Sequence, residues 1–337
     1  MRDLQITIAK AIGIILMVAG HSGCYDYMCS FIYMFHMPLF FFFAGYCFKE
    51  KYLEQPRAFI KKRLSSLYLP FVKWQMIFLL LHNVFYWLNI YNDDYGNIAL
   101  YSNWHEWGKA AWEILKMNSY EQLLGGYWFL KSLLIASILG IFIVKYDKSK
   151  CYIGGGCILL ALTIGMPLTG MHFPVIQEYD TFATVFFLVG YKYKSTFCQW
   201  HKSWKFALLC LAVVAIGPTY LQNGLLKFEE WQVIPYGITA VCGTLLTFYI
   251  SGKINAQNRR WKQWLVQIGD NTFTILTWHF LSFKLVSLLI IGIYGLPLAR
   301  LAEFPVIAEY AKQGWFVFYT AIGVFVPLLM ARNKHLK

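Results

Sequence analysis

The sequence predicts an all-α, polytopic membrane protein with about ten transmembrane helices, and three observations lead to that fold class. Of the 337 residues, 58% are hydrophobic and only 14% are charged, whereas soluble domains are roughly 45–50% apolar and about 25% charged. The mean hydropathy is +0.47. Tyr and Trp are abundant, at 23 and 13 residues, and such amphipathic rings collect at membrane–water interfaces.

The expected helices follow from apolar runs of about 20 residues, the length needed to cross a hydrocarbon core of about 30 Å. They are 4–22, 30–48, 66–90, 127–145, 152–169, 180–193, 204–221, 233–251, 270–294 and 313–331. The first run lacks the basic region and the clean cleavage site of a signal peptide, so we expect a permanent helix. No internal repeat divides the chain, which predicts one membrane domain over residues 1–337.

The net charge of +13 follows the predicted topology and does not indicate nucleic-acid binding. With the N-terminus in the cytoplasm, 21 of the 30 Lys and Arg residues fall on the cytoplasmic side and five on the opposite side. Membrane proteins retain basic residues in their cytoplasmic loops. The distribution therefore predicts that both termini are cytoplasmic.

The eight cysteines include no CxxC pair and no metal-ligand spacing, so no metal site is expected. Cys24 and Cys29 lie in an expected external loop, where an oxidising compartment could join them. A free pair is the simpler expectation.

Lys10 and His21 are ionisable residues within the first expected helix, where each such side chain costs roughly 2.5–3.5 kcal/mol on insertion scales. They are eleven residues apart, which is three helical turns plus about 20°, so they share one face about 16 Å apart. Asp3 falls on nearly the same stripe. A helix that only anchors a protein has no need of these residues, so the stripe indicates a functional path.

The stretch FHMPLFFFFAGY, residues 35–46, begins the second expected helix. The short connection before it predicts antiparallel packing, so His36 is expected to face His21 near the outer end of a shared cavity. Pro38 lies where its missing N–H costs least, and Gly45 permits close helix contact. We expect the phenylalanines to face lipid and neighbouring helices.

Four further residues are candidates for substrate binding: Trp128, Lys131, His279 and Glu113. Glu113 lies in the connection 91–126, whose acidic and aromatic residues suit sugar binding. Simpler interpretations remain open. A lone buried histidine is more often a helix contact, Lys131 can snorkel to the membrane surface, and the connection can lie on the membrane as an interfacial helix.

The blocks IAKAIGIILMVAGH and FHMPLFFFFAGY resemble acyltransferase family 3 integral membrane enzymes, with the fucose 4-O-acetylase-like proteins as the nearest branch. Lys10 and His21 match the family's basic residue and histidine with ten residues between them. KRLSSLYLPF resembles its basic element, with Arg63 matching and Ser66 at the second basic position. Thr7 and Ala44 also depart from the family pattern. GYWFL, FFLVGYKYK and IGDNTFTILTWHF are similar to later blocks, so the resemblance spans residues 5 to about 285.

This resemblance implies transfer of an acyl group, usually acetyl from acetyl-CoA, to a carbohydrate hydroxyl of a surface polysaccharide or its lipid-linked precursor. His21 would act as general base or as an acyl-histidine nucleophile, with Lys10 and His36 assisting. The cytoplasmic residues Lys61, Lys62 and Arg63, with Lys10, would bind the CoA phosphates, unless the basic run is only a topological anchor. Acetyl-CoA is then a donor substrate and no cofactor is bound permanently. The expected location is a bacterial inner (plasma) membrane.

A proton-coupled transporter or flippase of a glycan intermediate is the alternative, because intramembrane histidines and a cationic inner face suit transport. Duplicated halves and paired interrupted helices, which many transporters have, are not evident in the sequence.

Overall fold

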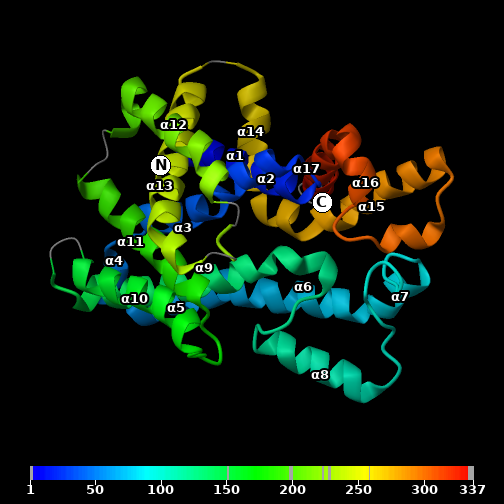
Figure 1. Cartoon of the computed structure of the whole chain (residues 1–337). Coiled ribbons are helices and arrows are strands. Elements are labelled where there is room, and N and C mark those ends of the chain that lie inside the picture. Colours follow the sequence, from blue (N-terminus) through cyan, green and yellow to red (C-terminus); the bar gives the residue numbers. More distant parts are fainter. Residues whose placement is uncertain are drawn as a thin grey trace. The chain divides into compact units, whose positions relative to one another are not determined.

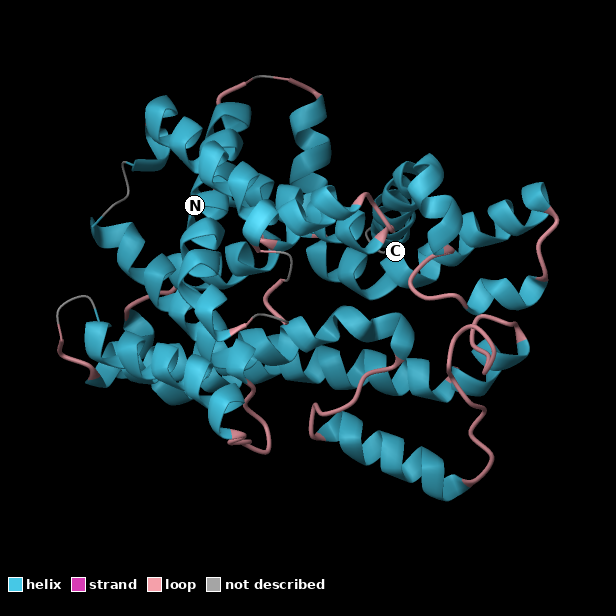
Figure 2. Cartoon of the chain, viewed as in Figure 1, coloured by secondary structure: helices cyan, strands magenta, loops and turns pink. Residues whose placement is uncertain are grey.

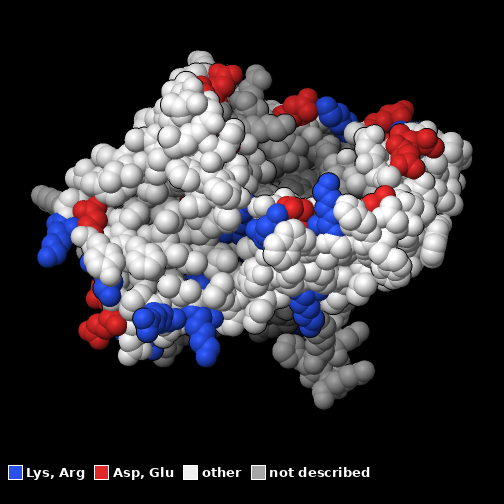
Figure 3. Space-filling view, turned by 90° about the horizontal axis from the view of Figure 1, so that it is seen from below, with Lys and Arg blue, Asp and Glu red and all other residues white. Residues whose placement is uncertain are grey.

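The computed structural model describes residues 3–149, 152–196, 200–221, 224–226, 229–257 and 259–332. Within these residues all regular secondary structure is helical, as Figures 1 and 2 show. Six segments are long and apolar enough to cross a membrane: Leu4–His21, Asp26–Tyr46, Gln122–Tyr146, Glu230–Asn255, Thr272–Tyr294 and Ala308–Ala331. Much of the face in Figure 3 carries no charged side chain, as expected of helices that contact lipid. The all-helical membrane class is therefore confirmed.

The count of ten spans is not confirmed. Helices α10 (Ile153–Thr169) and α12 (Trp204–Tyr220) are apolar but shorter than the other six. The expected span 66–90 is divided into α6 (Leu69–Leu80) and α7 (His82–Trp87). The expected span 180–193 forms α11 (Glu178–Thr196), whose charged residues lower its hydropathy. The orientation of the termini remains a prediction, and Arg2, Lys150, Lys227, Lys334 and Lys337 of the charge distribution lie outside the described residues.

Contacts divide the chain into two compact units, each assembled from three separate stretches. Unit 1 comprises Met1–Gly13, Ser30–Pro70 and Phe129–Val266, and unit 2 comprises Ile14–Cys29, Phe71–Trp128 and Gln267–Lys337. The continuous helix α1 (Leu4–His21) contributes its first part to unit 1 and its last part to unit 2.

Unit 1 is centred on α3 (His36–Tyr46), which packs against α11 and α13 (Val233–Asn255). Glycine allows the backbones of α3 and α11 to touch: a Cβ at Gly45 would lie 1.9 Å from the Phe187 carbonyl oxygen, and one at Gly190 would lie 2.0 Å from that of Phe42. The remaining elements are α2 (Asp26–Tyr33, which continues into unit 2), α4 (Lys51–Glu54), α5 (Pro56–Arg63), η1 (Leu64–Tyr68), α9 (Trp128–Tyr146), α10, η4 (Trp200–Lys202), α12, η5 (Glu230–Gln232) and most of α14 (Trp261–Asp270).

The phenylalanine run was expected to face lipid and neighbouring helices, and the structure places most of it against neighbouring helices inside unit 1. Phe41, Phe42 and Phe43 are buried. The Phe42 ring lies 5.4 Å from that of Tyr193, and the Phe43 ring 5.2 Å from that of Phe248. Because glycines bring α3 so close to α11, the rings beside them fill the interhelical space.

Unit 2 is centred on α15 (Thr272–Tyr294) and α17 (Phe316–Arg332), which pack along each other. Its other elements are α6, α7, α8 (Trp104–Leu115), η2 (Gln122–Tyr127), η6 (Leu298–Ala302), α16 (Ala308–Tyr310) and η7 (Ala311–Trp315). A disulfide joins Cys24 and Cys29 in the turn after α1, so the expectation of a free pair was wrong.

Candidate active site

His21 and His279 meet inside unit 2. His21 is the last residue of α1, and His279 lies two turns into α15, fully buried. The distance from His279 Nε2 to His21 Nδ1 is 3.5 Å, at the limit of a hydrogen bond. Phe280 covers the pair, because its ring stacks on His21 at 4.9 Å and lies 4.0 Å from the His279 ring.

The hydrogen bonds determine which ring nitrogens carry protons. His279 Nδ1 lies 2.9 Å from the Leu276 carbonyl oxygen and 3.2 Å from that of Ile275. A carbonyl only accepts, so neutral His279 carries its proton on Nδ1 and its Nε2 is an acceptor. His21 therefore donates from Nδ1, which leaves the lone pair of neutral His21 on Nε2. Within the described part of the chain, this Nε2 atom has no hydrogen-bond partner.

The segment η2 approaches the histidine pair closely. A Cβ at Gly126 would lie 3.0 Å from Leu276 Cδ1 and 3.8 Å from His279 Cε1. The next residue, Tyr127, hydrogen-bonds through its hydroxyl to Thr277 Oγ1 at 2.7 Å. Thr277 in turn donates to the Phe273 carbonyl oxygen, so Tyr127 is the donor. These contacts fix the backbone of η2 beside the imidazole of His279.

A second group of polar residues lies in unit 1 around the Cys47 thiol. Burial and the nearby Asp3 carboxylate raise the pKa of this thiol, while the nearby cations Lys10, Lys194 and Arg63 act in the opposite direction. The Arg63 guanidinium lies 5.1 Å from the Phe59 ring centre, and its buried Nε has no hydrogen-bond partner among the described residues. Burial lowers the Arg63 pKa. Three cations and an unused buried N–H suit an anion such as a phosphate.

Lys61 and Lys62, the other predicted phosphate-binding residues, are both exposed on α5. Lys62 donates to the Tyr52 hydroxyl at 3.3 Å, and this hydrogen bond lowers the Tyr52 pKa. They are available to long, mobile anions and are more strongly screened by solvent than Arg63.

The structure pairs His21 with His279, and the expected pairing of His21 with His36 stays a prediction, because the two residues belong to different units. His36 belongs to unit 1, where it is buried and its Nδ1 lies 2.9 Å from the Ile32 carbonyl oxygen. Asp3 has a local role as well, because its Oδ1 accepts the Gln5 N–H at 2.9 Å and so caps α1. A residue that caps the helix has a structural reason to be there.

The remaining predicted substrate residues have different surroundings. Trp128 is half-buried at the start of α9. Lys131 is only 4% exposed, so it does not snorkel, and it interacts electrostatically with the buried Asp180. Glu113 forms an exposed ion pair with Lys116 on α8, which is typical of a solvated helix face. No three metal-ligating side chains come together in the described ranges.

Residues 3–332 match the model of the acyltransferase domain known as acyltransferase family 3. The chain belongs to this family. No curated protein and no solved structure matches the chain. Family membership and the apolar helices together make the protein a membrane acyltransferase.

Several residues near the two polar groups of this acyltransferase have no role that its sequence predicts. Lys194 was counted only as a topological charge, although its place at the end of α11 brings it to Cys47. Tyr127, Thr277 and Phe280 stand within the recognised blocks, but nothing in their spacing shows contact with His21. Only the packing of η2 and α1 on α15 reveals their role.

The acyltransferase also contains a buried pair of His82 and Glu121, which no motif or spacing in the chain predicts. His82 Nδ1 lies 3.1 Å from Glu121 Oε2, and its Nε2 lies 3.0 Å from the Ala99 carbonyl oxygen. Burial acts to lower the His82 pKa, but the hydrogen bond and charge of Glu121, with the Ala99 carbonyl, raise it overall. Both nitrogens face acceptors, so His82 serves as a structural cation rather than as a base.

Proposed function

We propose that this membrane acyltransferase moves an acetyl group from cytoplasmic acetyl-CoA to a carbohydrate hydroxyl of a surface or extracellular polysaccharide or its lipid-linked precursor. The observation that carries the proposal is the oriented histidine pair. His279 accepts from His21 Nδ1, which directs the lone pair of His21 Nε2 away from α15 and leaves it available. An oriented imidazole is the side chain most often used as a general base.

In the proposed step, His21 Nε2 removes the proton of the sugar hydroxyl as its oxygen attacks the thioester carbonyl carbon. The new C–O bond forms, the C–S bond breaks, and the CoA thiolate takes the proton back from the imidazolium. General-base catalysis of this kind typically contributes about 10²–10⁴-fold. During the step His21 is positively charged, so its hydrogen bond to His279 strengthens.

The donor half of the proposal rests on the cations of unit 1. Arg63 and Lys194 with Lys10 would bind the CoA phosphates, and the exposed Lys61 and Lys62 would add attraction at longer range. The guanidinium of Arg63 matches two phosphate oxygens at once, which a lysine cannot do.

The acceptor half has less support from contacts. Neutral His36 donates from Nδ1 to Ile32, so polarising a thioester carbonyl through Nε2 would require its charged form. Positioning the acceptor hydroxyl requires no such change, and we assign His36 that role. Trp128 can stack on a sugar ring, and Lys131 with Asp180 can hydrogen-bond to its hydroxyls.

The test is thiol release from acetyl-CoA by the purified protein in nanodiscs, with the wild type beside His21→Ala and the exposed control His105→Ala. We expect release to fall at least about 100-fold in His21→Ala, with acetyl-CoA still bound, and to be unchanged in His105→Ala. More than a tenth of the wild-type rate in His21→Ala would refute the base assignment. Recovery of acetylated His21 from quenched reactions would favour the covalent mechanism.

A further inference from the structure

Lys284 is a buried cation in α15 that the proposed reaction does not use. It is 3% exposed, and its Nζ donates to the carbonyl oxygens of Leu301 and Glu303, both at 2.8 Å. An ammonium group is costly to bury in a membrane-spanning helix. A lysine kept there to hold two main-chain carbonyls indicates that the position of the held segment matters.

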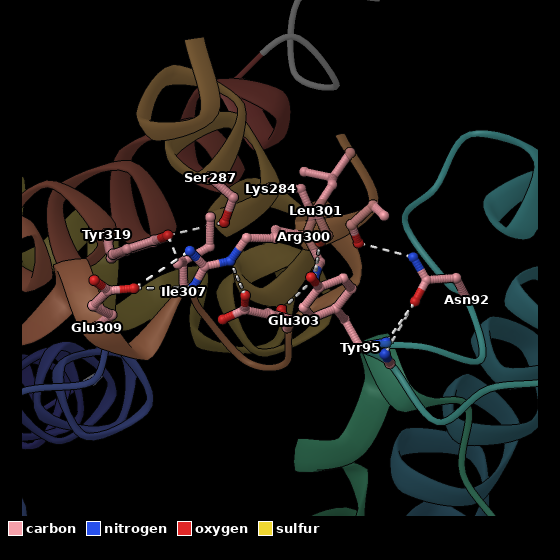
Figure 4. Close-up of polar contacts among 12 residues, drawn as sticks. Asn92, Tyr95, Lys284, Ser287, Arg300, Leu301, Glu303, Ile307, Glu309 and Tyr319 are labelled. Carbon is pink, nitrogen blue, oxygen red and sulfur yellow. Dashed lines mark hydrogen bonds and ion pairs between the residues drawn. The ribbon is translucent and has the colours of Figure 1, made fainter. Parts of the chain in front are cut away.

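The held segment comprises most of η6 and the residues after it, and we call it the 299–307 loop. It has three anchors (Figure 4). Asn92 Nδ2 donates to the Ala299 carbonyl oxygen at 2.8 Å at the beginning of the loop. Lys284 holds its middle. The Ile307 N–H donates to the Tyr319 hydroxyl, which also bonds to Ser287 Oγ at 2.9 Å, at its end.

Two of these anchors share one face of α15 with the residue that covers the histidine pair. Phe280, Lys284 and Ser287 follow the spacing i, i+4, i+7, which places them in one row along a helix. The loop therefore lies along this row. Between its middle and end anchors it carries Phe304, whose ring lies 4.6 Å from that of Phe280.

The loop also contacts the end of α1. His21 is followed closely by Gly23, whose positive φ of 74° belongs to the turn that ends the helix. A Cβ at Gly23 would lie 2.9 Å from Val306 Cγ2 and 2.7 Å from Ala311 Cβ. The loop therefore reaches the surroundings of His21 at two points: Phe304 contacts Phe280, which stacks on the His21 ring, and Val306 lies beside the turn that follows His21.

We propose that Lys284 is a positioning residue for acyl transfer: by holding the 299–307 loop, it keeps Phe304 on Phe280 and so fixes the ring of His21. The proposal rests on the function assigned above to His21. If Lys284 only stabilised the fold, its replacement would lower the stability of the protein without changing the reactivity of His21.

The experiment compares Lys284→Met, Lys284→Arg and the control Lys312→Met in nanodisc-held full-length protein. Lys312 belongs to the same unit and forms an exposed ion pair with Asp26. Two quantities are measured: kcat and KM with acetyl-CoA, and the rate at which diethylpyrocarbonate modifies His21, followed by mass spectrometry of its peptide. We expect Lys284→Met to lower kcat on the order of tenfold with KM unchanged, and to accelerate modification of His21 several-fold.

Lys284→Arg, which keeps donors for the two carbonyls, should recover part of both effects, and Lys312→Met should match the wild type. Wild-type reactivity of His21 in Lys284→Met would overturn the proposal, whatever happens to kcat. Phe304→Leu provides the same test if Lys284→Met does not fold, because it removes the ring and leaves the lysine bonds intact. If His21→Ala remains active, the function assigned to His21 fails, while the modification rate still decides whether Lys284 positions its ring.

Discussion

Replacing His279 by Phe tests the central contact of the proposed site. The substitution removes the acceptor for His21 Nδ1 and keeps an aromatic ring in a fully buried position beside Phe280 and Phe283. A hydrogen bond to a charged group contributes about 1.5–3 kcal/mol, and His21 is charged in the transition state. Since about 1.4 kcal/mol corresponds to tenfold in rate, we expect kcat to fall about 10- to 150-fold.

The assay is thiol release at saturating acetyl-CoA, with the donor KM measured in parallel. KM should change little, because the contact strengthens only when His21 takes a proton. His279→Gln is the matched variant, since its amide oxygen can accept the same hydrogen bond, and it should recover part of the loss. His105→Phe on the exposed face of α8 serves as the control. A His279→Phe protein that retains more than about half of the wild-type kcat would refute the reasoning.

Three further predictions concern other parts of the molecule. Gly45→Ala should lower the free energy of unfolding by the cost of overpacking, about 1–3 kcal/mol or more, because the added Cβ would overlap a carbonyl oxygen. Its thermal midpoint should fall, whereas that of Gly165→Ala, whose Cβ would have nothing within 4 Å, should not. Equal midpoints of the two variants by fluorescence-detected chromatography would contradict this prediction. Arg63→Gln should raise the KM for acetyl-CoA about tenfold or more. Replacement of the exposed Lys61 by Gln should raise this KM less and in a salt-dependent way. A larger KM in Lys61→Gln than in Arg63→Gln, measured by steady-state kinetics, would exclude Arg63 as a phosphate-binding residue. The folded-state pKa of His82 is raised, so its contribution to stability is complete below about pH 6.5 and is lost as the pH rises through the folded-state pKa. The thermal midpoint of the wild type should therefore fall over this pH range, and that of His82→Gln should not show the same fall.

The sequence alone predicted the class of fold and named several residues of the candidate site. Hydropathy predicted each of the six helices that, among the described residues, are long and apolar enough to cross a membrane, because a run of apolar residues is sufficient to specify such a helix. Other expected spans are not confirmed where an apolar run is interrupted at Leu81 or where charges accumulate in α11, since helix ends and buried charges depend on neighbouring elements. The spacing of Lys10 and His21 and the match at Arg63 were likewise readable, because motifs within one segment are local.

The tertiary structure decided the partners of those residues. Helical periodicity gives the face of a helix on which His21 lies, but not which helix faces it. A short connection predicted His36 as the neighbour of His21, and the contact that the structure shows is with His279, 258 residues away. The roles proposed for Lys194 and Lys284 likewise depend on tertiary contacts. Their neighbours come from distant segments that pack together only after folding, so no spacing along the chain could assign them.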